Sequence, residues 1–214
     1  MALRESCPFP DHAKGTVIMF LEYVAGMEYD PSLEIEERDD VYPPSEDSIL
    51  LIESLDITEG ERVLEVGCGS GVVSIHCAKN RGVVTSVDIN PSAVELTSIN
   101  FSKNRLEGNV FISDLYENVS GIFDTIVFNL PYLPVDEEGM LEKAWSGGND
   151  GMGPFPALLD GSEDYLSEKG RVVVVTSSLM DQDVLGELLS RYSVKTLGEL
   201  PLFFEKLFVL EIRK

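Results

Sequence analysis

Residues 62–80, RVLEVGCGSGVVSIHCAKN, decide the fold of this chain. The apolar segment at 62–66 predicts a short strand, and the residues after the glycines predict a helix that runs to Asn80. Glycines between a strand and a helix allow a tight turn and the close approach of a ligand to the backbone. Here they follow a G-x-G-x-G spacing, at Gly67, Gly69 and Gly71. The dinucleotide fingerprint is G-x-G-x-x-G, and its last position is Val72 in this chain, which weakens an NAD-binding interpretation.

Strands and helices continue to alternate after this unit. Short apolar segments predict further strands at 83–88, 109–113, 123–128 and 171–175. Helices are expected from Asn90-Pro91, where Asn is the cap, and over about 156–168 and 181–191. This alternation is typical of an α/β fold, with a mostly parallel sheet that carries helices on both faces. Two final strands, near 193–199 and 203–212, are joined by a few residues around Pro201, which permits only an antiparallel hairpin.

The amino-terminal part of the sequence lacks the strand–helix alternation predicted for the rest of the chain. We divide the sequence into an N-terminal arm, residues 1–40, and one globular domain, residues 41–214. Within the arm, the segments 17–24 and 32–37 predict a β-hairpin. At the start of the domain, Ser45 is expected to cap a helix with acidic residues in its first turn.

Composition restricts the possible partners. The chain has 214 residues and a formal net charge of −22, from 38 acidic and 16 basic residues. This charge repels phosphate backbones, so nucleic-acid binding is disfavoured. The odd number of cysteines, at spacings that match neither a disulfide framework nor a metal site, predicts no metal and a reducing cytoplasmic location. The apolar run at 16–27 contains Glu22 and is too short to span a membrane, so no membrane association is expected.

Polar side chains follow several strands of the predicted sheet. Glu65, Asp88, Asp114 and Asn129 stand at the carboxyl ends of four predicted strands, and open α/β sheets bind their ligands along this edge. Asp88 lies twenty-one positions after Gly67, where a carboxylate can accept hydrogen bonds from ribose hydroxyls. The glycine loop and the spaced acid together predict a nucleoside-type cofactor.

Six segments together resemble one family of enzymes: VYPPSEDS (41–48), LEVGCGSGVVS (64–74), DINP (88–91), SDL (113–115), FNLPY (128–132) and AWSGGNDG (144–151). The chain is similar over residues 41–212 to the class I S-adenosylmethionine (AdoMet) methyltransferases with an N-P-P-Y motif. More closely, it resembles the archaeal and eukaryotic release-factor glutamine methyltransferases. The resemblance implies a Rossmann-like sheet of seven strands with an antiparallel last strand. It also implies AdoMet contacts at Tyr42, Ser48, Glu65, Gly67, Gly69, Asp88, Ile89, Asp114, Leu115 and Asn129.

The segment Asn129-Leu130-Pro131-Tyr132 corresponds to the catalytic motif of that family. A carboxamide nitrogen is a poor nucleophile and far too weak an acid for a side chain to deprotonate, so general-base catalysis gains little. Two acceptors placed on its N–H bonds can orient it and stabilise the developing charge. We expect them to be the Asn129 side-chain oxygen and the Leu130 backbone carbonyl, with Tyr132 packed on the planar amide. Leu130 departs from the family, which usually has proline there.

Other functions compatible with the same motif stay open at this stage. An adenine N6-methyltransferase requires the same two acceptors, although the net charge of −22 argues against it. Lysine methylation is implied for some relatives of the family. A further hypothesis is that the protein binds AdoMet as a scaffold without catalytic activity. Trp145, within a long glycine-rich loop over about 130–153, is expected to be either a substrate contact or a packing anchor.

A protein partner is also implied. Members of the resembled family often work with a small zinc-containing activator subunit, and they act on a translation release factor at its Gly-Gly-Gln segment. In this chain the strand NVFIS (109–113) is expected at the edge of the sheet, where Val110, Phe111 and Ile112 would form a sticky surface unless something covers it. A strand of the partner could add there.

Overall fold

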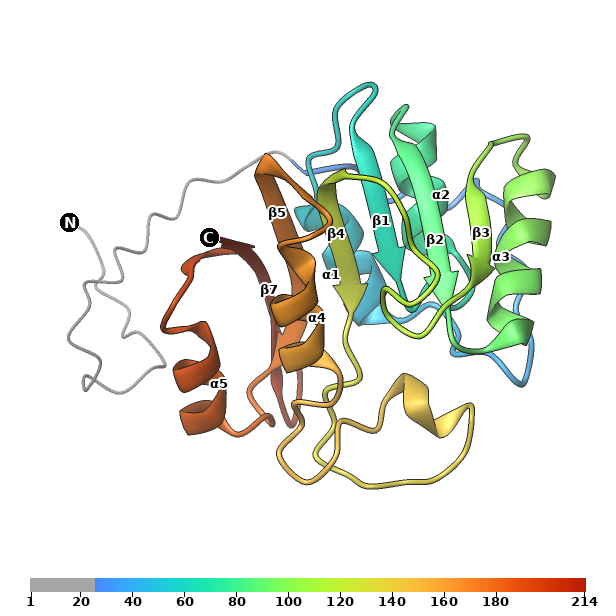
Figure 1. The fold of residues 1–214 in the computed structure, drawn as a ribbon. Coiled ribbons are helices and arrows are strands. Elements are labelled where there is room, and N and C mark those ends of the chain that lie inside the picture. Colours follow the sequence, from blue (N-terminus) through green and yellow to red (C-terminus); the bar gives the residue numbers. More distant parts are fainter. Residues whose placement is uncertain (1–25) are drawn as a thin grey trace, which may run out of the picture.

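The computed structural model describes residues 26–214, which form a single seven-stranded sheet with helices on both faces (Figure 1). Its order is β3-β2-β1-β4-β5-β7-β6. The first five strands pair in parallel, and β7 runs antiparallel to both of its neighbours. The predicted fold class is therefore confirmed. The strands are β1 (Arg62–Val66), β2 (Val83–Asp88), β3 (Asn109–Ile112), β4 (Phe123–Asn129), β5 (Leu166–Ser177), β6 (Ser193–Pro201) and β7 (Lys206–Arg213).

Two apolar layers sandwich the sheet, because successive side chains of a strand point to opposite faces. Ile126 and Val172 belong to one layer, whereas their neighbours Val127 and Val173 belong to the other. The first layer packs against α4 (Phe155–Ser162) and α5 (Gln182–Leu189), and the second against α1 (Glu46–Ser54), α2 (Val72–Lys79) and α3 (Pro91–Lys103). Among the described residues, no helix is both long and apolar enough to cross a lipid bilayer.

Several predicted boundaries differ from the structure. The helix predicted over 156–168 ends at Ser162, and β5 begins at Leu166 rather than at 171. The early start of β5 follows from its pairing with β4, where Phe123 lies opposite Leu166 and an irregularity precedes Thr125. Ser45 occupies the cap position of α1, but its hydroxyl bonds to the Glu46 carboxylate (2.7 Å) and does not cap the helix.

The strand predicted over 32–37 is wrong, and its proposed partner over 17–24 lies outside the described residues. Residues 33–37 belong to no strand, because Asn100 of α3 and Asn104, which caps the end of that helix, satisfy part of their backbone. Asn104 accepts from the Glu34 N–H (2.9 Å) and donates to the Glu34 carbonyl (2.9 Å). Asn100 bonds Glu36 in the same reciprocal way, at 2.8 and 3.0 Å. This part of the arm is therefore attached to α3.

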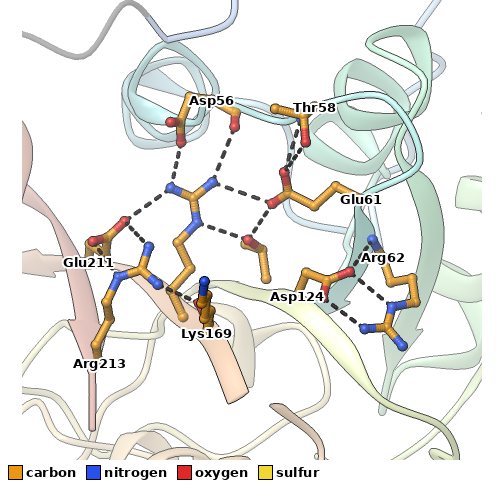
Figure 2. A network of polar contacts seen from close by, with 10 residues as sticks. Asp56, Thr58, Glu61, Arg62, Asp124, Lys169, Glu211 and Arg213 are labelled. Carbon is orange, nitrogen blue, oxygen red and sulfur yellow. Dashed lines mark hydrogen bonds and ion pairs between the residues drawn. The ribbon is translucent and has the colours of Figure 1, made fainter. Parts of the chain in front are cut away.

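A network of charged residues joins the amino ends of the central strands, on the side of the sheet away from their carboxyl ends (Figure 2). Its centre is Arg171 of β5, which is only 7% exposed. The guanidinium contacts Asp56 (2.5 Å) and Glu211 (3.0 Å), and its Nε donates to Thr125 (2.9 Å). Burial alone would raise the pKa of Glu211, but the nearby Arg213 and Arg171 lower it below its ordinary value.

Candidate active site

The carboxyl ends of β1, β2 and β4 and the turn after β3 border a cavity of about 280 Å³. Figure 1 shows the long loop after β4 lying below this edge of the sheet. Nearly all of the predicted site residues line the cavity; the side chains of Leu130 and Tyr132 belong instead to the apolar layers. The lining includes Tyr42, Ser48, Glu65, Gly67, Gly69, Asp88, Ile89, Asp114, Leu115, Asn129 and Pro131.

The glycine loop adopts left-handed backbone conformations that favour glycine. Gly67 has a φ of +65°, and a Cβ atom there would lie 2.5 Å from the Phe128 ring. Gly69 has a φ of +53°, and its Cβ would meet only the Tyr42 carbonyl, at 3.8 Å. The first glycine is thus required for packing, whereas the second leaves open space on the cavity side. This space would let a ligand approach the backbone.

Glu65 is buried at the end of β1, with 3% exposure. It accepts hydrogen bonds from the Ser74 N–H (2.9 Å) and from the Ser74 hydroxyl. Burial raises the pKa of Glu65 to about 8, and the hydrogen bonds from Ser74 oppose this shift. A cationic group in the cavity would therefore find a carboxyl group that gains stabilisation when it ionises.

Asp88, at the end of β2, fixes the shape of the glycine loop. Its carboxylate accepts from the Gly69 N–H (2.9 Å) and from the Asn90 N–H (2.8 Å). Burial raises the pKa of Asp88 despite these hydrogen bonds. The side chain therefore supports the loop and also lines the cavity, where its remaining acceptor capacity would be available to a ligand.

The turn after β3 holds a non-glycine residue in a left-handed conformation. Leu115 has a φ of +45°, which is uncommon for a branched side chain. Ser113 stabilises the turn, since its hydroxyl donates to the Leu115 carbonyl (2.9 Å) and accepts from the Asn118 N–H (3.0 Å). Such backbone outliers cluster at ligand sites. Asp114, which is exposed, and Leu115 both line the cavity.

Asn129 ends β4, beside Val175 of β5. Its side-chain oxygen is buried and, among the described residues, has no hydrogen-bond partner. Leaving a buried polar atom unsatisfied costs about 1–3 kcal/mol, and a ligand that donates a hydrogen bond to this oxygen would remove that cost. The next residue, Leu130, is 2% exposed and packs in the layer that contains Leu158 and Leu159.

Tyr132 packs between the two apolar layers and is half-buried. Burial raises the pKa of its hydroxyl far above the ordinary value, and the charges of Asp47 and Glu205 act in the same direction. The hydroxyl therefore stays neutral. Tyr42, on the wall before α1, has its pKa raised to about 12 by burial and by Asp47, whose carboxylate accepts from it at 3.3 Å.

Part of the segment 139–146 also lines the cavity, and the sequence did not assign this role to it. This strap includes the short 3₁₀ helix Glu142–Ala144 and contributes Met140, Leu141 and Lys143 to the lining. Among the described lining residues, Lys143 is the one cation. Trp145 does not line the cavity: its indole N–H donates to Glu137 (2.7 Å), so it anchors the loop internally. The glycine-rich composition indicated that this segment is a loop, but it did not indicate the path of the loop along the cavity.

Relatives with the same fold identify the family. Residues 45–198 match the methyltransferase small domain family. The chain is 38% identical over 178 residues to a putative protein N5-glutamine methyltransferase of Methanocaldococcus jannaschii, covering 80% of this chain and 90% of that protein. It is 35% identical over 153 residues to methyltransferase HEMK2 of Mus musculus, covering 64% of this chain and 72% of that protein.

A solved structure supports the same fold. A chain from the E. cuniculi Mtq2–Trm112 complex, responsible for methylation of the eRF1 translation termination factor, matches with a TM-score of 0.65 and 23% identity. The match covers 82% of this chain and 99% of that chain. The sequence resemblance is thereby confirmed: this chain belongs to the methyltransferase small domain family, among the relatives of the release-factor glutamine methyltransferases.

Proposed function

We propose that this protein transfers a methyl group from AdoMet to the side-chain amide nitrogen of a glutamine in a translation release factor, at its Gly-Gly-Gln segment. Its relatives support this assignment, since one is named as a putative protein N5-glutamine methyltransferase. The structural observation that carries the proposal is the buried oxygen of Asn129, which has no hydrogen-bond partner within the part of the chain that the structure describes. Because release factors act in translation, we also propose a cytoplasmic location.

The cavity fits AdoMet in its chemistry. When bound, AdoMet supplies a methyl group on a positively charged sulfur, which makes that carbon electrophilic. Glu65 would hold the amino group of the methionine part, since this buried carboxyl group gains stabilisation from a neighbouring cation. Asp88 would accept from the ribose hydroxyls and Asp114 from the adenine amino group. The open space beside Gly69 leaves room for the ligand against the backbone.

Two oxygens of this chain would position the amide group that receives the methyl group. A glutamine amide has two N–H bonds, and the Asn129 side-chain oxygen can accept from one of them. The Leu130 backbone carbonyl would accept from the other. Both oxygens would hold the amide nitrogen in place and stabilise the positive charge that develops on it as the new N–C bond forms. No side chain has to remove a proton before that step. The S–CH3 bond would break as the N–C bond forms, the neutral thioether would leave, and the nitrogen would lose its extra proton to water afterwards.

Leu130 supports this geometry although the family usually has proline at its position. The acceptor is a backbone carbonyl, so the identity of the side chain does not change the acceptor itself. With 2% exposure, the leucine side chain is fixed by packing in the core. Pro131 further restricts the backbone of Leu130 to extended conformations. Packing thus replaces the covalent restriction that a proline ring would give, and we expect an active enzyme.

We further propose that a small zinc-containing activator subunit covers β3. The structure places β3 at one end of the sheet, and Ile112 is 48% exposed there. Among residues 26–214, no strand pairs with the outer side of β3. An added strand from a partner would satisfy this edge and bury Ile112. The related E. cuniculi protein was solved as a complex with Trm112.

Methyl transfer from labelled AdoMet provides the test. The substrates are a release factor, its variant with alanine in place of the Gly-Gly-Gln glutamine, and a panel of DNA and RNA. We expect label on the native factor alone, and mass spectrometry should place the methyl group on the glutamine side chain. Label on nucleic acid with none on the factor would refute the proposal and favour an adenine methyltransferase. Label on lysine would favour the lysine-directed alternative.

A further inference from the structure

The turn between β6 and β7 carries an unusual exposed cluster. Phe203 is 91% exposed and Phe204 is 86% exposed. Leu202, next to them, is 36% exposed, so three consecutive apolar side chains face solvent. We call residues 202–204 the aromatic tip. Single exposed apolar residues are ordinary, but a contiguous exposed cluster marks an interaction site.

The aromatic tip is held in a defined shape. The two phenyl rings meet edge to face, with their centroids 4.6 Å apart and their planes at 83°. The Leu202 N–H donates to the Glu205 carbonyl across the turn (2.8 Å). Glu205 in turn accepts from the Ser177 hydroxyl at the end of β5 (2.6 Å). A rigid aromatic pair loses little conformational entropy when a partner covers it, which favours binding.

The register of the sheet places the aromatic tip on the same edge as the acceptor oxygens. Asn129 lies beside Val175 of β5, and Val175 lies opposite Val209 of β7. These two steps cover roughly 10 Å across the sheet, since neighbouring strands are about 4.8 Å apart, and Phe204 precedes Val209 by five further residues. The turn that precedes β7 therefore projects from the carboxyl edge, which Figure 1 shows at the bottom of the sheet. The charge of Glu205, at the base of the tip, also acts on Tyr132.

We propose that the aromatic tip is a docking surface for the folded protein substrate, and that it inserts into an apolar depression beside the loop that carries the target glutamine. This inference rests on the proposed function, because it assumes that the substrate is a folded protein whose surface can contact the tip. Aromatic anchors that fill a pocket dominate the free energy of protein–protein binding. The tip would thus select a folded protein over a free peptide.

Other occupants fit the aromatic tip less well. The cofactor binds in the cavity, whose lining does not include residues 202–204. Nucleic acid and anionic lipid surfaces are repelled by a chain with a net charge of −22. The activator subunit is expected at β3, whereas β6 and β7 form the opposite end of the sheet. A protein substrate that must reach Asn129 approaches the edge from which the tip projects.

The test compares two substrates with one double variant, Phe203→Ser with Phe204→Ser. The enzyme is the full chain, purified with any subunit that binds it. One substrate is the intact release factor, and the other is a short peptide around the target glutamine that is too small to reach the tip. We expect the KM for the intact factor to rise by roughly tenfold or more, as for the loss of interface anchors. The kcat for the factor, the kcat/KM for the peptide and the binding of AdoMet should stay unchanged.

The matched control is Val83→Ser with Ile122→Ser, which removes two exposed apolar side chains (60% and 42% exposed) at the amino ends of β2 and β4. It should leave both substrates unaffected. Equal loss with factor and peptide, or an unchanged KM for the factor, would overturn the docking role alone. A wild-type dimer that becomes a monomer on substitution would also overturn it, because the tip would then join two copies. Failure of the wild type on both substrates would overturn the proposed function itself.

Discussion

Among residues 26–214, no donor reaches the buried side-chain oxygen of Asn129, and the proposed chemistry gives it one. Asn129→Ala removes this acceptor, so the rate of methyl transfer should fall by about 10²-fold or more, as when one preorganised group of an active site is deleted. The dissociation constant for AdoMet, measured by calorimetry, should change little.

The control for this prediction is Asn149→Ala, which truncates an exposed asparagine in the same long loop. It should retain the wild-type rate, since surface substitutions usually change little. Full methyl transfer by Asn129→Ala would show that the two-acceptor description of the site is wrong. A parallel loss of AdoMet binding would show that Asn129 acts on the cofactor instead.

The raised pKa of Glu65 predicts that the protein releases protons when the cofactor binds. With a pKa raised to about 8, the carboxyl group holds its proton at pH 7 in the free protein. A cationic amino group beside it lowers that pKa, so binding of AdoMet at pH 7 should release up to about one proton. Calorimetry in two buffers with different ionisation enthalpies measures this release. Glu65→Gln should abolish it, and equal release by the variant would place its source elsewhere.

At the level of elements, a substitution in β3 should affect binding of the activator subunit and not binding of AdoMet. Ile112→Lys places a charge on the exposed edge strand, and charged side chains on edge strands block pairing with another chain. Co-purification of the activator subunit should be lost, while AdoMet binding persists. Val83→Lys, at an exposed position on the neighbouring strand, is the control. Retained co-purification by Ile112→Lys would locate the subunit on another surface.

The elements also show how far sequence reasoning reaches. The carboxyl ends of parallel strands meet at one edge, so the positions of Glu65, Asp88 and Asn129 along the chain were enough to predict a shared cavity. The strap at 139–146 could not be placed, because its path depends on distant contacts. One of these is the Leu133 N–H, which donates to the Trp145 carbonyl (3.0 Å).

The predictions of element boundaries were wrong for a related reason. The strand expected over 32–37 had the right composition, but Asn100 and Asn104 supply the hydrogen bonds that a strand would have supplied. Local pattern shows which segments are extended, and it does not show what pairs with them. The helix before β5 likewise stops at Ser162 because the paired strand β4 determines where β5 begins.

At the level of the whole molecule, Arg171 of β5 connects the segment before β1 with β4 and β7. Arg171→Met removes a buried cation and leaves Asp56, Glu61 and Glu211 without their shared partner. Breaking such a buried arrangement costs about 3–5 kcal/mol, so the free energy of unfolding should drop by that amount in urea denaturation. Because the network lies away from the carboxyl edge, the folded variant should still bind AdoMet.

The control is Arg191→Met, which breaks an ion pair with Asp160 whose two side chains are 57% and 62% exposed. Exposed pairs contribute about 0–1 kcal/mol, so its stability should stay near that of the wild type. Equal stability of both variants would show that the buried network contributes no more than a surface pair.

The attachment of the arm to α3 depends on a match between two repeat lengths. Four residues of an α-helix advance by about 6 Å, and two residues of extended chain advance by about 6.6 Å. Asn100 and Asn104 are four apart, while Glu34 and Glu36 are two apart, so both amides reach backbone groups on the same side of the arm. A shift by one residue would present the opposite side to the helix and break all four hydrogen bonds. The rise of the helix therefore sets the register of the arm, and with it the point where Val41 and Tyr42 begin the cavity wall.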